Sequence, residues 1–250
     1  EPYSAAIEGR HQHALDKELE LTGGKGTLSD FATGYLYFGL HRTRRGWEFR
    51  EWAPNAKEIY LIGDFNDWKE HGDYRMYHVK NSPGVWEVEL QSGAIKHGDL
   101  YKLKVRWNGG EGERIPAWAN RVVQDEQTKI FSAQVWEPEN PYRFRKKVFR
   151  AKTDPLMIYE CHIGMAQEEE RVGTYNEFRE KILPRIAEAG YNCIQIMAIQ
   201  EHPYYGSFGY HVSSFFAPSS RFGTPDELKE LIDTAHRMGI AVIMDIVHSH

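Results

Sequence analysis

The stretch Ala241-Val-Ile-Met-Asp-Ile-Val-His-Ser-His250 decides how the rest of the chain is interpreted. Five of its first six residues are apolar, which is typical of a strand covered on both faces, as in a parallel sheet. Asp245 lies near the carboxyl end of that strand, where the loops of α/β folds carry functional residues. The stretch therefore predicts a buried parallel strand with a site at its end.

The acidic and histidine side chains of this stretch are the first site candidates. A carboxylate in an apolar strand needs polar partners at the rim, and Asp245 is expected to find them in a pocket. Strict alternation puts Asp245 and His250 on opposite faces, so both can line one pocket only if the strand ends before His250. His248 is expected to be structural. A metal site on His248 and His250 needs further ligands that the sequence does not show, and we expect no metal.

Strands and helices alternate in the residues before this stretch. Capping boxes that begin at Thr174 and Thr224 predict two helices, and Pro184 predicts a kink in the first. Apolar runs at 156–159 and 193–199 predict two more strands. This order is the start of a parallel α/β fold of the TIM-barrel type. Three strands are too few for a complete barrel, which takes roughly 250 residues, so we expect a longer polypeptide.

Residues 30–135 have a different texture. Their short strands show a two-residue period, clearest from Tyr101 to Trp107, and turn signals separate them. This predicts an all-β, immunoglobulin-like sandwich. Residues 136–155 are rich in proline and basic residues and predict a surface linker. Residues 1–29 predict an amphipathic helical segment that packs on the rest. The predicted fold is thus multidomain, with the truncated barrel occupying residues 156–250.

Composition limits the classes of partner. The chain is 41% hydrophobic and 27% charged with a net charge of -5, and it lacks a basic block, which argues against nucleic acid and anionic membranes. Seven Trp and 14 Tyr suit a ligand held by ring faces, such as a sugar. No run approaches the ~20 apolar residues of a membrane span. Cys161 and Cys193 are expected to be free thiols in a reducing, cytoplasmic compartment rather than a disulfide.

Several motifs together resemble known families. Trp52-Ala-Pro54 and Gly63-Asp-Phe-Asn-Asp-Trp68 resemble carbohydrate-binding module family 48, and Asp245-Ile-Val-His-Ser-His250 resembles the first conserved block of glycoside hydrolase family 13. Residues 197–210 and 213–224 are similar to the branching group of that family, particularly its eukaryotic type. The resemblance implies a monomeric enzyme without cofactor that acts on α-glucans such as glycogen, amylose and amylopectin. It would cleave an α-1,4 bond and transfer the cut chain to a 6-hydroxyl.

The resemblance also implies residue roles. The nucleophile and the acid/base lie on later barrel strands, so no residue here takes either role. Asp245 and His250 would hydrogen-bond the reacting sugar, and the ring of Tyr210 would lie beneath it with its phenol in water. Four residues of the sandwich would bind glucan: Trp52, Pro54, Trp68 and Lys104.

Several alternatives remain open from the residues alone. Tyr210 could pack the loop, Trp52 and Trp68 could belong to the sandwich core, and Lys104 could be part of a solvated charged face. Glu201 and His202 are expected to hold the loop. For the whole protein the alternatives are a debranching or amylase-type hydrolase and a non-catalytic glucan-binding scaffold.

Overall fold

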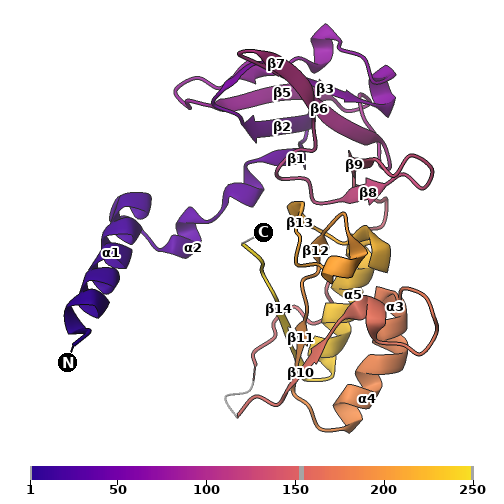
Figure 1. Ribbon diagram of the computed structural model, residues 1–250. Coiled ribbons are helices and arrows are strands. Elements are labelled where there is room, and N and C mark those ends of the chain that lie inside the picture. Colours follow the sequence, from indigo (N-terminus) through magenta and orange to yellow (C-terminus); the bar gives the residue numbers. More distant parts are fainter. Residues whose placement is uncertain (1, 152–154, 249–250) are drawn as a thin grey trace.

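The computed structural model describes residues 2–151 and 155–248. Figure 1 shows a β-sandwich above an α/β unit, with a helix projecting from the side of the sandwich. His250 lies outside the described residues, so its expected place in the pocket has no structural counterpart.

Two antiparallel sheets form the sandwich. The first has the order β1-β2-β5-β4, with bounds β1 (Gly39–Arg42), β2 (Gly46–Trp52), β5 (Val85–Gln91) and β4 (Tyr77–His78). The second has the order β3-β6-β9-β8, with bounds β3 (Ala56–Gly63), β6 (Leu100–Trp107), β9 (Phe131–Gln134) and β8 (Val122–Gln124), and β7 (Gly110–Arg114) pairs with β6. Alternate residues such as Phe49, Ile59 and Leu103 fill the core between the sheets. The predicted sandwich is confirmed.

Three parallel strands form the sheet of the α/β unit. They are β10 (Ile158–Cys161), β11 (Cys193–Ile196) and β14 (Ala241–Met244), and they neighbour one another in chain order. The connecting helices are α3 (Tyr175–Glu177), α4 (Leu183–Glu188) and α5 (Pro225–Arg237), and their inner faces share one apolar core with the strands. Both capping boxes, at Thr174 and Thr224, form as predicted. Neighbouring strands in chain order, joined by helices, are the beginning of a TIM-type barrel.

Two details of the α/β unit differ from the expectation. The irregularity expected at Pro184 is a π-helical turn, Phe178–Ile182, which ends two residues before the proline. The wider turn accommodates the missing N–H of the proline. The strand β14 was expected to be covered on both faces, and this is wrong for the described chain. Ile243 and Met244 are 37% and 42% exposed, because no described element covers that part of the strand.

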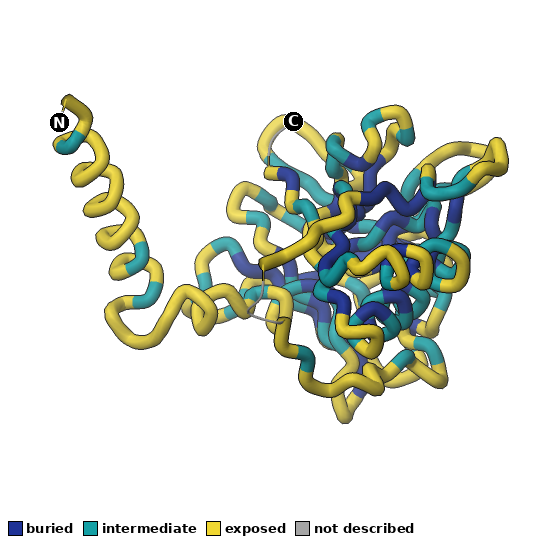
Figure 2. The backbone as a smooth tube through the Cα atoms, turned by 90° about the horizontal axis from the view of Figure 1, so that it is seen from below, coloured by how far each residue is buried: buried dark blue, intermediate teal, exposed yellow. Residues whose placement is uncertain are grey.

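The N-terminal segment also corrects a prediction. It forms α1 (Ser4–Thr22) and α2 (Leu28–Phe31), and neither helix has a buried residue. Figure 2 shows α1 exposed along most of its length, with a few half-buried residues, and projecting away from the buried parts of the two modules. The expected packing of this helix on the other described residues is wrong, because its apolar side chains are too scattered to form one continuous stripe. No helix among the described residues could span a membrane.

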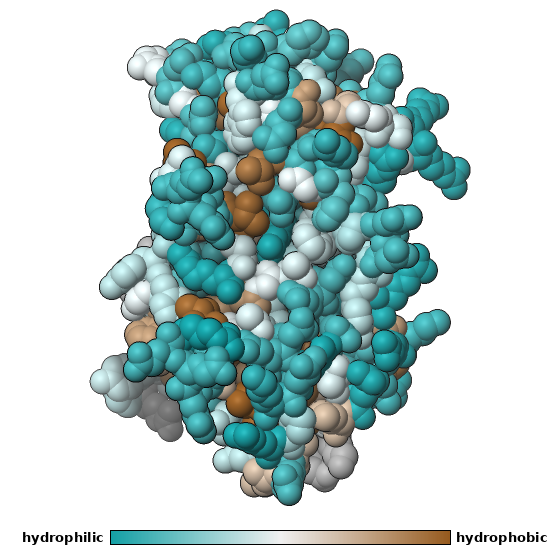
Figure 3. Space-filling model, turned by 90° about the vertical axis from the view of Figure 1, so that its right-hand side faces the viewer, coloured by the Kyte–Doolittle hydropathy of each residue, from teal (hydrophilic) through white to brown (hydrophobic). Residues whose placement is uncertain are grey.

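A long loop after β11 joins the two modules. It contains the two-stranded pair β12 (Gln200–Glu201) and β13 (Ser214–Pro218), and Ala217 of β13 packs into the core of the sandwich. Figure 3 shows that one face of the molecule is largely hydrophilic, with separate small apolar areas rather than one broad patch. Because Ala217 packs into the sandwich, the loop after β11 links the sandwich to the strands of the α/β unit. The same loop carries Tyr210.

Candidate functional site

Asp245 lies directly after β14 and is held by two side chains. The hydroxyl of Tyr210 donates to its Oδ2 at 3.0 Å, and Nε2 of Gln195 donates to its Oδ1 at 2.8 Å. The backbone N–H of Asp245 also donates to Ile196 O at 3.1 Å, which fixes the residue at the carboxyl end of the sheet. The structure thus brings two predicted site residues together and adds Gln195, which the sequence analysis missed. Its only signal was an amide side chain inside an apolar strand.

A glycine turn brings Tyr210 to the strand ends. Gly209 has φ +90°, and a Cβ there would lie 1.8 Å from the carbonyl oxygen of Ala198. Only glycine allows the backbone to approach so closely in this conformation. Tyr210 N–H then donates to Ser207 O at 3.0 Å, which closes the turn. The loop is therefore folded back onto the end of β11, where Tyr210 meets Asp245.

The phenol of Tyr210 was expected to lie in water, but its hydroxyl instead donates a hydrogen bond to Asp245. Burial raises the pKa of Tyr210, and the hydrogen bond to Asp245 and the charge of that carboxylate raise it further. The phenol therefore stays protonated and acts as a donor. Since a carboxylate has about four acceptor sites and the two side chains use one on each oxygen, acceptor capacity remains for a ligand hydroxyl. The arrangement is suited to binding a hydroxyl-rich molecule.

Glu201 and His202 hold the loop, as expected. Glu201 is fully buried, and its carboxylate accepts hydrogen bonds from the N–H groups of Ser220 at 2.7 Å and His202 at 3.0 Å. Its carbonyl accepts from Ser213 N–H at 2.9 Å. Nδ1 of His202 lies 2.9 Å from the carbonyl of Gln200. These contacts join the two ends of the β12–β13 pair.

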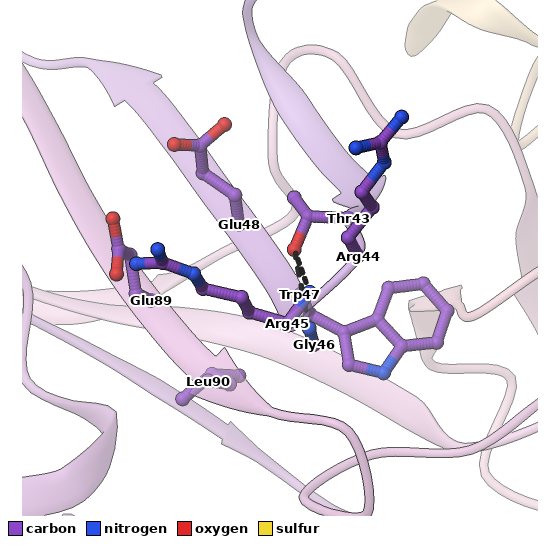
Figure 4. Close-up of a pocket in the computed structure, with 8 residues that line it drawn as sticks. All are labelled: Thr43, Arg44, Arg45, Gly46, Trp47, Glu48, Glu89 and Leu90. Atoms are coloured by element: carbon purple, nitrogen blue, oxygen red, sulfur yellow. Dashed lines mark hydrogen bonds between the residues drawn. The ribbon is translucent and has the colours of Figure 1, made fainter.

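Metal-ligand spacing occurs elsewhere among the described residues. The carboxylates of Glu48, Glu87 and Glu89 lie close enough to share an ion, but Arg50 pairs with the first two. Figure 4 shows residues that line an adjoining hollow, with Arg45 reaching toward Glu89. The volume of this hollow is about 290 Å³. Arg50 offsets part of the negative charge of this cluster, and two of the three carboxylates are already held in ion pairs. His248 is exposed and belongs to no such group within the described ranges.

The four expected glucan-binding residues of the sandwich fall into two places. Trp52 is 58% exposed at the end of β2, and a Cβ on Gly84 would lie 2.9 Å from its Nε1 and 3.0 Å from Pro54 Cβ. Trp68 is 37% exposed just beyond the other end of β3. The eight residues of β3 span about 23 Å at ~3.3 Å per residue. Exposure excludes the alternative that either ring is core, and β3 lies between the two positions along the chain.

The basic partner of Trp68 is Lys102 rather than Lys104. The ammonium of Lys102 lies 5.9 Å from the centre of the Trp68 ring and also pairs with Glu113 at 3.0 Å. That of Lys104 pairs with Glu111 at 2.6 Å. The indole N–H of Trp68 donates to Asp64 Oδ1 at 3.0 Å, which orients the ring. Both lysines lie on the outer face of β6, so alternation alone could not distinguish them.

Comparison with known families identifies both modules. Residues 37–119 match the carbohydrate-binding module 48, or isoamylase N-terminal domain, and residues 143–250 match the alpha amylase catalytic domain. The first part of the chain is therefore similar to a carbohydrate-binding module and the second part to the alpha amylase catalytic domain. The Asp245 site lies within the segment that matches the catalytic domain.

Curated relatives refine this likeness. The chain is 44% identical to the 1,4-alpha-glucan-branching enzyme of Dictyostelium discoideum, over 100% of the chain and 37% of the relative. It is 47% identical to the 1,4-alpha-glucan-branching enzyme 2-2, chloroplastic/amyloplastic, of Arabidopsis thaliana, over 99% of the chain and 31% of that protein. The chain thus spans about a third of the length of these relatives.

Solved structures share the fold. A putative alpha amylase from Salmonella typhimurium is 26% identical with a TM-score of 0.68, and the match covers 85% of this chain and 33% of the other. A pullulanase from Bacillus acidopullulyticus is 19% identical with a TM-score of 0.67, over 85% of this chain and 30% of the pullulanase. At such identity the pullulanase match shows the fold alone.

Proposed function

We propose that this chain is part of a 1,4-alpha-glucan branching enzyme. The observation that carries the proposal is its similarity to branching enzymes along the whole chain, including 44% identity to the Dictyostelium discoideum relative. Such an enzyme cleaves an α-1,4 bond of glycogen or starch and transfers the cut chain to a 6-hydroxyl. The reaction is the double displacement of retaining glycosidases, with a sugar hydroxyl in place of water in the second step.

The site around Asp245 is proposed to hold the sugar that reacts. Its carboxylate, oriented by Tyr210 and Gln195, would accept hydrogen bonds from sugar hydroxyls with its remaining lone pairs. The ring of Tyr210 would cover the apolar face of the same sugar. His250 would add a further hydrogen bond. The nucleophile and the acid/base would come from parts of the enzyme outside this chain.

The sandwich, residues 30–135, is proposed to hold a distant part of the same glucan. Trp68 offers an exposed ring with the ammonium of Lys102 beside it, and Lys104 lies on the same outer face. Trp52 and Pro54 would form a second contact at the opposite end of β3. Binding a long chain at two places raises the effective concentration of glucan at the barrel. The free thiols of Cys161 and Cys193 fit a reducing, cytoplasmic compartment, and we propose that the enzyme acts there as a monomer.

Product analysis of the full-length enzyme tests this function. Amylose is incubated with the enzyme, and α-1,6 anomeric protons are counted by NMR while reducing ends are titrated chemically. Branching predicts new α-1,6 signals without a matching rise in reducing ends. A rise in reducing ends without α-1,6 signals would identify a hydrolase, and no change in either would identify a non-catalytic glucan-binding protein. Asp245→Asn serves as the impaired control.

A further inference from the structure

A short segment of the sandwich, Trp118 to Arg121, contacts the loop that carries Tyr210. The ring of Trp118 stacks on Phe216 of β13, with centroids 4.1 Å apart and planes 17° apart. Its opposite neighbour is Phe38, at 5.3 Å and 19°. Figure 1 shows the ends of β8 and β13 close together at this junction, and residues of the two strands are in contact. The aromatic stack therefore spans the two modules.

Arg121 adds a buried cation to the same junction. It is only 8% exposed, and its guanidinium donates a hydrogen bond to the carbonyl oxygen of Gly223 at 2.5 Å. Burial lowers the pKa of Arg121, and the negative charge of the fully buried Glu201 acts in the opposite direction. A buried charge is costly unless opposite charge or hydrogen bonds compensate it. The loop thus supplies a hydrogen bond and a nearby negative charge to a cation that belongs to the sandwich.

Both sides of this contact are anchored. In the sandwich, Ala119 is buried in the core, and the carbonyl of Arg121 accepts from Gln134 N–H at 2.9 Å. In the loop, Glu201 ties together Ser220 and Ser213 through the carboxylate and carbonyl contacts described above. Tyr210 lies three residues before Ser213. A displacement of the loop at Gly223 or Phe216 would therefore be felt at Tyr210.

We propose that Arg121, with Trp118, is a positioning residue for the branching reaction. The two side chains fix the β12–β13 loop so that the hydroxyl of Tyr210 meets Asp245 at hydrogen-bonding distance. The sandwich then has a role in catalysis that is separate from glucan binding. The inference rests on the proposed branching function, since it concerns the turnover of that reaction.

The first test compares two arginine variants of the full-length enzyme. Arg121→Met removes the buried cation, which lies 5.4 Å from the centre of the Trp136 ring. Arg114→Met is the matched control, because it removes an exposed arginine that lies 5.0 Å from the centre of the Trp107 ring. Misplacement of a catalytic group by about 1 Å can cost up to roughly 100-fold in rate, and we expect Arg121→Met to lower kcat about tenfold. KM for amylose should change less than about twofold, because the glucan contacts of the sandwich stay intact. Arg114→Met should alter neither constant.

A double-mutant cycle with Tyr210→Phe separates positioning from a general structural role. If Arg121 acts through the Tyr210 hydroxyl, Arg121→Met should lower kcat less than about twofold once that hydroxyl is absent. A full repeat of the tenfold loss in the Tyr210→Phe background would overturn the proposal, as would an unchanged kcat in Arg121→Met. If Arg121→Met fails to fold, Phe216→Leu takes its place, because it removes the aromatic stack but keeps apolar bulk. It is expected to show the same coupling to Tyr210→Phe, and additive losses of kcat in that pair would also overturn the proposal. If the unaltered enzyme forms no α-1,6 bonds, the proposed function itself fails.

Discussion

Replacing Tyr210 by phenylalanine removes one hydroxyl from the Asp245 site and leaves the ring. The lost hydrogen bond joins a phenol to a carboxylate at 3.0 Å, and bonds to charged groups contribute about 1.5–3 kcal/mol. Because Gln195 still holds the other carboxylate oxygen, we take the low end of that range. Since ~1.4 kcal/mol corresponds to a factor of ten, we expect kcat/KM for branching to fall about tenfold.

The assay compares Tyr210→Phe with Tyr210→Ala and Tyr205→Phe in the full-length enzyme. Tyr210→Ala also removes the ring, so a further severalfold loss is expected from about 1 kcal/mol of lost stacking. Tyr205→Phe removes a hydroxyl from the same loop and should leave kcat/KM unchanged. Thermal melts of all three variants should stay within a few degrees of the parent. Equal activity in Tyr210→Phe and the parent would refute the reasoning, as would a fall in melting temperature that parallels the fall in activity.

Three further outcomes follow from single residues. Gly209→Ala is expected to abolish branching, because its Cβ would collide with the carbonyl of Ala198; a fully active variant would contradict the loop geometry. Lys102→Ala should weaken maltoheptaose binding to the enzyme, measured by calorimetry, more than Lys104→Ala does, and the reverse order would refute the assignment of Lys102. Burial and the nearby His202 lower the pKa of His162 below 6.5. Because the unfolded chain then binds more protons than the folded one, the stability present above pH 6.5 is lost as the pH falls below 6.5. His162→Phe should flatten the fall of melting temperature with decreasing pH, and an unchanged slope would show that another group titrates.

The order of elements could be predicted from the sequence because local patterns encode it. The capping boxes at Thr174 and Thr224 and the strict alternation of β6 are each complete within a few residues. The packing of α1 could not be predicted in the same way. Packing depends on complementary apolar surfaces on other elements. A helix with scattered apolar residues has no continuous apolar stripe from which a packing partner could be predicted.

The site could be predicted only in part, since its contacts join distant residues. Asp245 and Tyr210 stood out by residue type and motif, but their hydrogen bond depends on how Gly209 folds the loop onto β11. Gln195 could not be predicted as a site residue, because the alternation of a strand covered on both faces does not indicate which face a polar side chain takes. The choice between Lys102 and Lys104 on β6 required the position of Trp68, which follows β3.

A crystal structure of the full-length enzyme with a bound malto-oligosaccharide tests most directly whether this loop and strand build a glucan subsite. We predict a pyranose whose hydroxyls lie within hydrogen-bonding distance of the Asp245 carboxylate, above the ring of Tyr210, with the Tyr210 to Asp245 bond retained. A structure with oligosaccharide bound elsewhere and the Asp245 carboxylate facing only protein groups would contradict that assignment.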